Sequence, residues 1–91
     1  MPDPLLRKIQ ETPSFTKEFQ ELVPDKNEAS NFLSGIRRQL VWKAEFGKKI
    51  DATDVWCETF PDIPNGRLIG IYYKFDPSNV IIHSAMGASI H

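Results

Sequence analysis

Three side chains in the last quarter of the sequence have the types needed for acid–base chemistry on an anionic substrate. Tyr72 and Lys74 are two residues apart in an alternating apolar segment, and His83 lies in the next such segment. A histidine titrates near neutral pH and can accept or donate a proton, while a lysine can face a phosphate. The competing interpretation is that all three are ordinary residues on the solvated face of a sheet.

A predicted β-hairpin would place these side chains together. Residues 67–75 alternate in apolar character, residues 80–85 return as a second strand, and the Asp-Pro-Ser-Asn sequence between them favours a type I turn. Pairing across this turn puts Tyr72 opposite His83. A shift by one residue would bury Lys74, which disfavours another register. The residues expected on the outer face of the sheet are Leu68, Gly70, Tyr72, Lys74, Ile81, His83 and Ala85.

The first half of the sequence predicts helices. Residues 3–11 begin with Asp-Pro, which favours a short helix, with a first strand as the alternative. Residues 12–23 give the same start signal and end before a proline. Residues 25–46 form a longer helix, whose apolar phase continues through Gly35. Its apolar stripe is Ala29, Phe32, Leu33, Ile36, Leu40 and Ala44.

The pattern after residue 50 changes to that of strands. Residues 55–60 are β-branched and aromatic, and Pro61 is expected to end this strand. The tail, residues 86–91, is expected to be loose. We therefore predict one α+β domain over residues 1–91, with N-terminal helices packed in two layers on a small antiparallel sheet of about three strands. The long helix should contact the sheet face that carries Ile71, Tyr73 and Ile82.

A tryptophan lies on the side of the long helix opposite to the apolar stripe. At 100° per residue, Arg38 and Trp42 share this side and stand one turn apart. Tryptophan and arginine are enriched among the residues that anchor protein interfaces, so both are candidate partner-binding residues. The alternative is that the N-terminal segment covers Trp42, and the helical angle leaves both interpretations open.

Composition excludes several classes of protein. The net charge is −1 and the isoelectric point about 6.1, which disfavours a general nucleic-acid-binding protein. Cys57 is the only cysteine, so an intrachain disulfide is excluded, and we expect Cys57 to be a small buried residue. Histidines at metal-binding spacing are absent, which predicts no metal site. No apolar run is long enough for a membrane helix or signal peptide, so we expect a cytoplasmic protein without membrane contact.

Two segments resemble a known family. Residues 13–22, PSFTKEFQEL, look like the first helix of RelE/ParE/HigB-type toxins. Residues 66–76, GRLIGIYYKFD, followed by Val-Ile-Ile at residues 80–82, are similar to the central hairpin of those proteins, where an arginine opens a tyrosine-rich strand. The resemblance covers residues 13–85 in the order of elements. It implies a second helix, a small antiparallel sheet, and a strand at the beginning of the chain.

The same resemblance implies a toxin–antitoxin protein that acts on RNA as a metal-independent endoribonuclease. Arg67 and Lys74 would stabilise the scissile phosphate, His83 or His91 would be the general acid or base, and Tyr72 would orient or stack on the substrate. The 2′-hydroxyl of RNA would serve as nucleophile, so no cofactor is expected. The expected partners are a protein, either an antitoxin or a target enzyme, and RNA.

A different class of function competes with the ribonuclease. The chain could be a noncatalytic binding protein: an immunity-type inhibitor, an antitoxin-like partner, or a phage-encoded inhibitor of a host enzyme. The isoelectric point near 6 and the position of Trp42 favour this alternative. The sequence does not identify the oligomeric state.

Overall fold

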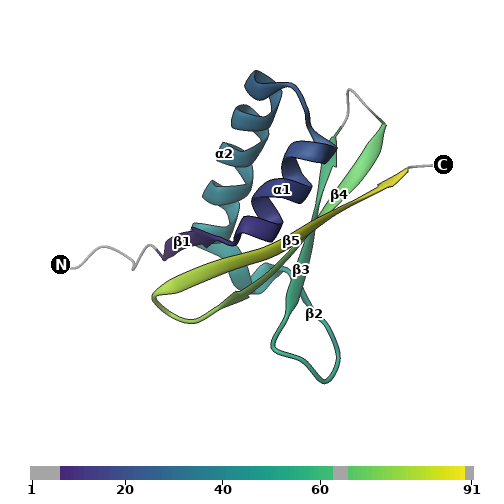
Figure 1. Cartoon of the computed structure of the whole chain (residues 1–91). Coiled ribbons are helices and arrows are strands. Elements are labelled where there is room, and N and C mark those ends of the chain that lie inside the picture. Colours follow the sequence, from purple (N-terminus) through teal and green to yellow (C-terminus); the bar gives the residue numbers. More distant parts are fainter. Residues whose placement is uncertain (1–6, 63–65, 90–91) are drawn as a thin grey trace.

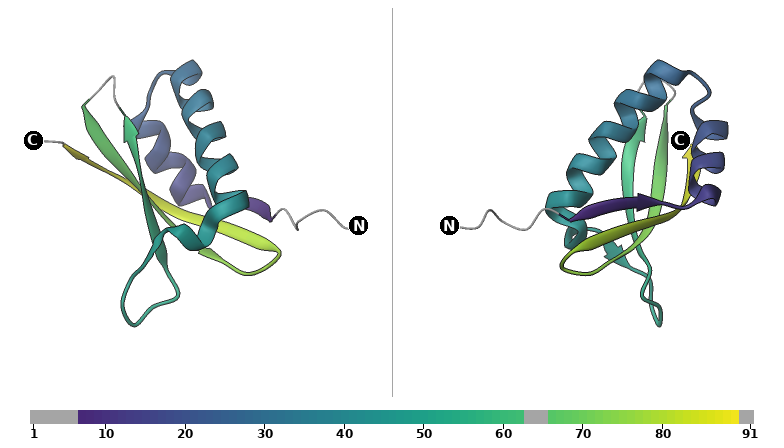
Figure 2. Two further views of the ribbon diagram at one scale, coloured as in Figure 1. Left: turned by 180° about the vertical axis from the view of Figure 1, so that it is seen from behind. Right: turned by 60° about the vertical axis from the view of Figure 1, so that its left-hand side comes forward.

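Two helices pack on one face of a mixed β-sheet, which makes the chain an α+β protein (Figures 1 and 2). The structure, a computed structural model, describes residues 7–62 and 66–89. The described elements in chain order are β1 (Lys8–Glu11), α1 (Pro13–Leu22), α2 (Lys26–Lys43), the 3₁₀ helix η1 (Ala44–Phe46), β2 (Lys48–Lys49), β3 (Trp56–Asp62), β4 (Arg67–Phe75) and β5 (Asn79–Ser89).

The sheet is larger than predicted. Within the described residues it has five strands in the order β1-β5-β4-β3-β2. Strands β2 to β5 pair antiparallel, whereas β1 pairs parallel to β5. The prediction of helices on a sheet is confirmed, but the prediction of about three antiparallel strands is wrong. The two additional strands are the short ones at the edges, β1 and β2.

Strand β1 corrects the prediction of a helix at the beginning of the chain. Residues 8–11 are extended, and residues 3–6 of the predicted helix lie outside the described residues. The backbone N–H of Lys8 donates to Ser78 O at 2.9 Å, and Ile9 packs against the core. Pairing with the edge of β5 thus satisfies backbone groups that a short local helix would leave unpaired at its ends.

The two longer helices begin where their capping residues predict. The hydroxyl of Thr12 accepts a hydrogen bond from Phe15 N, with Pro13 in the first turn of α1. The carboxylate of Asp25 accepts hydrogen bonds from the N–H groups of Asn27 and Glu28. These bonds pair backbone donors that the first turn of a helix leaves free. Helix α2 is continuous through Gly35, as predicted.

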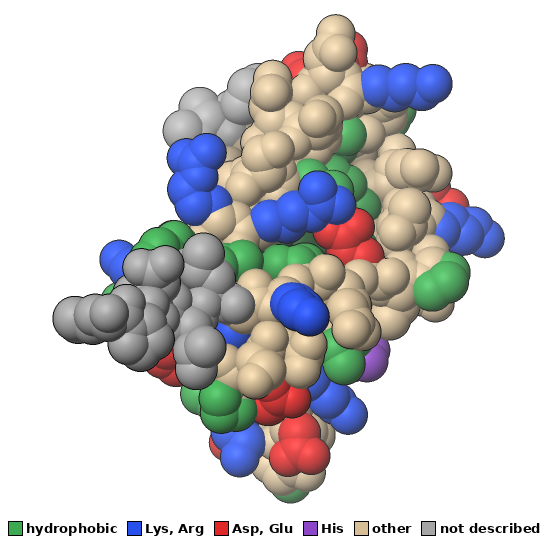
Figure 3. Space-filling model, turned by 90° about the vertical axis from the view of Figure 1, so that its left-hand side faces the viewer, with side chains coloured by type: hydrophobic (Ala, Val, Ile, Leu, Met, Phe, Trp, Pro, Cys, Tyr) green, Lys and Arg blue, Asp and Glu red, His purple; other side chains and the backbone are tan. Residues whose placement is uncertain are grey.

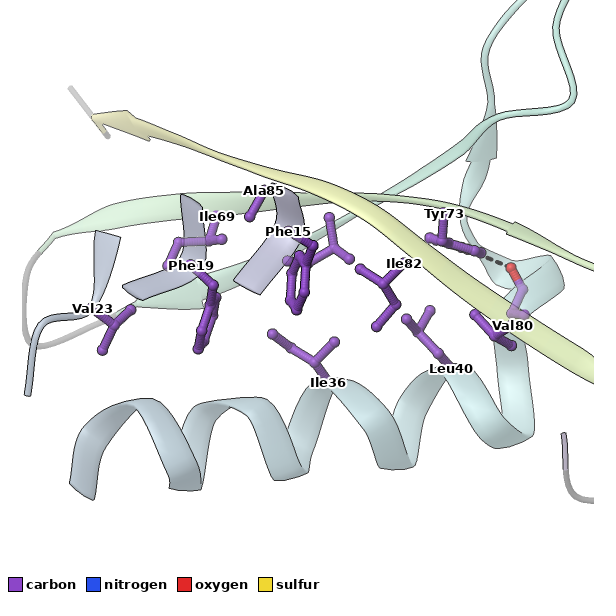
Figure 4. Packing of buried hydrophobic residues seen from close by; sticks show 12 residues of the cluster. Phe15, Phe19, Val23, Ile36, Leu40, Ile69, Tyr73, Val80, Ile82 and Ala85 are labelled. Carbon is purple, nitrogen blue, oxygen red and sulfur yellow. Dashed lines mark hydrogen bonds between the residues drawn. The ribbon is translucent and has the colours of Figure 1, made fainter. Parts of the chain in front are cut away.

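The core lies between the helices and the sheet (Figure 4). Ile36 and Leu40 of α2 are completely buried, and they point toward the sheet face that carries Ile71, Tyr73 and Ile82. This confirms the predicted phase of the long helix. Phe32 and Leu33 of the same stripe are only partly buried. The other fully enclosed or nearly enclosed core residues are Phe15, Phe19, Val23, Ala44, Ile69, Val80 and Ala85.

A close backbone approach joins the end of the helical layer to the sheet. The Tyr73 hydroxyl donates a hydrogen bond to the carbonyl of Ala44, drawn as a dashed line in Figure 4. A Cβ atom at Gly47 would overlap this hydroxyl. We therefore expect Gly47→Ala to break the hydrogen bond and lower the free energy of unfolding by about 1–3 kcal/mol, the cost of an unsatisfied buried polar group.

A matched glycine on helix α2 provides the control for that prediction. A Cβ at Gly35 would have no atom within 4 Å, and alanine is favoured over glycine in a helix by about 1 kcal/mol. Gly35→Ala should therefore raise the stability in urea denaturation while Gly47→Ala lowers it. Equal effects of the two substitutions would contradict the close approach at Gly47.

The β4–β5 hairpin has the predicted register next to its turn and a different one beyond it. Tyr73 pairs with Ile82, as predicted, but Tyr72 pairs with Ser84. The prediction that Tyr72 lies opposite His83 is therefore wrong, because a β-bulge inserts one extra residue into β5. Past the bulge the alternation is reversed, so Ala85, which was predicted on the outer face, is buried in the core.

Strands β3 and β5 run further than predicted. Pro61 does not end β3, since it pairs with Leu68 in the ladder and the strand continues to Asp62. Strand β2 pairs with only the first two residues of β3, so Pro61 sits on a sheet edge, where a missing N–H is tolerated. Residues 86–89 of the tail, which was predicted to be loose, pair with β4 up to Arg67.

Candidate functional site

One face of the sheet is left uncovered by the helices, which both lie on the other face (Figures 1 and 2). Leu68 and Met86 on this open face are exposed to 37% and 62%. Tyr72 and Lys74 are on the same side of β4 as Leu68, because alternate residues of a strand share a face. The open face, as the strand pairings define it, comprises Cys57, Thr59, Leu68, Gly70, Tyr72, Lys74, Ile81, Ser84 and Met86.

A tyrosine–cysteine pair lies near the middle of the open face. Tyr72 and Cys57 are directly opposite each other on β4 and β3, and each side chain affects the pKa of the other. Burial raises the pKa of the Cys57 thiol, and the Tyr72 hydroxyl partly offsets this effect. The charge of an ionised Cys57 and then burial raise the pKa of Tyr72. Both groups are consequently neutral hydrogen-bonding groups at neutral pH.

Gly70 lies beside both of these side chains, and a Cβ atom there would make ordinary van der Waals contacts with them. A Cβ atom at Gly70 would lie 3.6 Å from the Cys57 sulfur and 3.9 Å from the Tyr72 hydroxyl. The prediction that Cys57 is a buried residue is only partly right, because it is half-buried. Its position beside Tyr72 was not foreseen, since the sequence does not give the register between β3 and β4.

Lys74 lies at the turn end of the open face. Its side chain is exposed, and it borders a hollow of about 110 Å³ together with Asp76 and Asn79. The Asp76 carboxylate accepts hydrogen bonds from the backbone N–H groups of Ser78 and Asn79, and these bonds lower its pKa. These hydrogen bonds fix the conformation of the β4–β5 turn, and the turn fixes the position of the end of β4, where Lys74 lies.

His83 is the residue that the bulge adds to β5. Because Ile82 and Ala85 both point into the core, His83 and Ser84 between them lie on the side of the open face. The Nε2 atom of His83 is enclosed and has no hydrogen-bond partner among the described residues. The carbonyl of His83 accepts a hydrogen bond from the Thr12 hydroxyl at 3.0 Å, which ties the bulge to the start of α1.

Arg67 does not lie with Tyr72 and Lys74. It lies two residues before the buried Ile69 on β4, so both side chains are on the same face. The Arg67 guanidinium is therefore on the helix side of the sheet. There it donates to Asp62 Oδ2 at 2.8 Å and to the carbonyl of Leu22 at the end of α1. Its contacts therefore join α1 to the sheet. His91, the alternative acid or base, lies outside the described residues.

A second hollow lies beside the tyrosine–cysteine pair. It has a volume of about 420 Å³ and opens between β2, the following loop and β3. Cys57 and Thr59 form one side of it, and Lys48 and Lys49 bring positive charge to the other. Sequence reasoning placed these lysines only beyond the end of the long helix. The structure brings them to the edge of the open face.

The two candidate partner-binding residues are exposed near the end of helix α2. Trp42 retains 52% of its surface, and Arg38 one turn before it is also exposed. Phe46 of η1 is exposed to 68%, and Lys43 Nζ lies 5.3 Å from the centre of its ring. The structure thus leaves Trp42 largely uncovered, although residues 3–6 of the segment proposed to cover it are outside the described residues.

The face formed by α1, α2 and β1 carries basic side chains that stand apart from one another (Figure 3). Acidic side chains lie among them, and the Arg37 guanidinium donates two hydrogen bonds to the Glu11 carboxylate at 2.6 and 2.9 Å. This arrangement does not form the continuous basic stripe that nucleic-acid-binding surfaces usually have.

The described residues show neither a metal-binding cluster nor a membrane-spanning helix. In residues 7–62 and 66–89, no three histidine, cysteine or acidic side chains are grouped so that they could hold a metal ion. Neither of the described α-helices is long and apolar enough to cross a membrane. No protein-family model matches the sequence, and a search of curated proteins finds no significant match.

Proposed function

We propose that this chain is a RelE-like protein of the toxin–antitoxin type that binds RNA on the open sheet face and cleaves it without a metal ion. The observation that carries the proposal is the placement of Tyr72, Lys74 and His83 on the face that no helix covers. The order of elements also supports it. The resemblance implies a strand, two helices and then a hairpin, and β1 supplies the strand that the local pattern did not favour.

The proposed reaction uses a nucleophile that RNA itself contains. The 2′-oxygen attacks the adjacent phosphorus, the bond from phosphorus to the 5′-oxygen breaks, and a 2′,3′-cyclic phosphate and a 5′-hydroxyl result. One proton leaves the 2′-hydroxyl and one is delivered to the leaving 5′-oxygen; His83 carries out one of these transfers and water the other. Lys74 stabilises the negative charge that develops on the phosphate. Tyr72, with its raised pKa, remains a hydrogen-bond donor that orients the substrate.

The Nε2 atom of His83 is enclosed, so this role requires the His83 side chain to open toward the substrate when RNA binds. A buried polar atom without a partner is unusual in a folded chain, and a bound ligand is one way to supply the missing hydrogen bond. The change of register at the bulge means that Tyr72 and His83 are not opposite each other. The proposal therefore requires the substrate to reach both residues across the face.

The experiment that tests the proposal is cleavage of a single-stranded RNA by the purified chain in the presence of EDTA. We expect a 2′,3′-cyclic phosphate product, and we expect His83→Gln to lower the rate by about 10²–10⁴-fold, the usual contribution of a general acid or base. Glu21→Gln, an exposed change on α1, is the matched control and should retain full activity. Full activity of His83→Gln would contradict the assignment of His83, and the absence of any cleavage would contradict the ribonuclease.

A second candidate function is that of a noncatalytic binding protein, such as an immunity-type, antitoxin-like or phage-encoded inhibitor of another protein. The exposure of Trp42 and Phe46 on rigid helical segments favours it, since aromatic side chains are frequent anchors of interfaces. Arg67, one of the two residues expected to stabilise the phosphate, is also occupied on the other side of the sheet. This function predicts stable association with a protein and no RNA cleavage.

A further inference from the structure

Two exposed aromatic rings and two cations lie close together in the sequence where helix α2 passes into η1. Arg38 and Trp42 are neighbours on one side of α2, four residues apart. Lys43 follows Trp42 and lies over the ring of Phe46. We call these four residues the aromatic patch. Trp42 and Phe46 are among the most exposed large apolar side chains of the described residues, and neither contributes to the core.

The charges beside the aromatic patch are not neutralised within the chain. Arg38 and Lys43 form no salt bridge with any residue in the ranges that the structure describes. Glu45 is the acidic residue of the same segment, and its carboxylate lies 3.3 Å from Arg7 Nη1. That carboxylate is therefore directed toward the N-terminal segment. Both side chains are exposed and are therefore free to pair with carboxylates of another molecule.

We propose that the aromatic patch binds an acidic peptide segment of a partner protein, with apolar side chains of that segment packed on Trp42 and Phe46. Carboxylates of the segment would pair with Arg38 and Lys43, while the rings supply rigid contact area. The inference rests on the second candidate function, association with a protein, and it holds whether or not the open face cleaves RNA.

RNA is the less favoured occupant of the aromatic patch. Proteins that bind single strands usually combine aromatic rings with a positively charged groove that follows the backbone over several nucleotides. The aromatic patch lies on the outer side of a helix and has two cations. The chain as a whole carries a net charge of −1, which gives no general attraction for a polyanion.

The experiment measures binding of three labelled probes to the full chain by fluorescence anisotropy. The first is a 12-residue synthetic peptide with leucines at positions 1, 4, 5 and 8 and glutamates elsewhere. The second has lysine in place of each glutamate, and the third is a 12-nucleotide polyuridine RNA. We expect the glutamate peptide to bind at least tenfold more tightly than the lysine peptide, and its affinity to fall as salt is added.

Variants locate the binding on the molecule. Trp42→Ala and Arg38→Glu should each weaken binding of the glutamate peptide about tenfold or more. Lys26→Glu makes a similar charge change on the same helix, about 18 Å from Arg38 along its axis, and should have no comparable effect. If Trp42→Ala unfolds the chain, Phe46→Ala and Arg38→Glu decide the question, with thermal unfolding recorded for each variant.

Four outcomes would overturn the proposal. They are equal binding of the two peptides, tighter binding of RNA to the same residues, unchanged binding by Trp42→Ala, and self-association of the chain through Trp42 in gel filtration. None of these depends on cleavage of RNA. A failure of this inference is therefore distinct from a failure of the proposed ribonuclease, which the His83→Gln assay tests separately.

Discussion

Replacing Leu40 with alanine is expected to lower the free energy of unfolding by about 2–5 kcal/mol. Leu40 is completely buried, and it points from the C-terminal part of α2 toward Tyr73 and Ile82 (Figure 4). Its removal deletes apolar contacts and leaves a cavity that close-packed neighbours fill only in part. For a chain of 91 residues this is a large share of the total stability. Urea denaturation followed by circular dichroism measures the change.

Leu68→Ala is the matched control for the Leu40 experiment. The substitution removes the same atoms, but Leu68 lies on the open face and keeps 37% of its surface in the folded chain. We expect its effect to be well below that of Leu40→Ala, because less apolar area leaves water on folding. Equal losses for the two variants would mean that the open face is covered in solution, for example by a second chain.

The helical layer could be predicted because its signals are local. A capping side chain next to a proline sets the start of α1, and Asp25 sets the start of α2. The phase of the apolar stripe then determines which residues face inward. The same phase placed Trp42 on the side opposite to the apolar stripe but left open whether another segment covers it, and the structure has it exposed. Each inference needed only residues within a few turns of one another.

The errors concern contacts between distant segments. Strand β1 is extended because the edge of β5, about 70 residues later, provides its hydrogen-bond partners. The local Asp-Pro signal for a helix contains no information about that edge. The bulge at His83 is similar, since it is stabilised by a hydrogen bond from Thr12 across 71 residues. A hairpin register predicted from the turn alone cannot include such an insertion.

The candidate site was predicted in part for the same reason. Tyr72 and Lys74 share a face because they are two residues apart in one strand, and the structure places them so. The position of Arg67 was also available from the sequence, since Arg67 and Ile69 must share a face. The resemblance implied that Arg67 binds phosphate, although its position two residues before Ile69 puts it on the helix side of the sheet. The position of Cys57 beside Tyr72 follows from the β3–β4 register, which no local sequence signal provides.

Arg67 is expected to be a stabilising residue, and Arg67→Met should lower the free energy of unfolding by about 3 kcal/mol. The Asp62 side chain is only 7% exposed, and Arg67 donates to it at 2.8 Å. Removing one partner of a buried ion pair usually costs about 3–5 kcal/mol. The low end applies because Arg67 retains 23% of its side-chain surface and water screens part of the interaction.

An exposed ion pair in the same chain provides the comparison. Arg37 donates to Glu11 at 2.6 and 2.9 Å, but the Arg37 side chain is 47% exposed. Arg37→Met should therefore cost less than about 1 kcal/mol. If both variants lose the same stability, the burial of the Arg67–Asp62 pair does not have the effect assigned to it.

The Arg67 variant also separates a structural role from the phosphate-binding role that the resemblance implies. With the guanidinium tied to Asp62 and to the end of α1, Arg67→Met should reduce RNA cleavage only in proportion to the folded fraction. The assay is therefore run well below the melting temperature, where the variant remains folded, and compared with Lys74→Met. We expect a large loss of activity for Lys74→Met and little for Arg67→Met, because only Lys74 lies on the open face. The reverse result would require Arg67 to leave its partners and contact the substrate, and would contradict the placement of the site on that face.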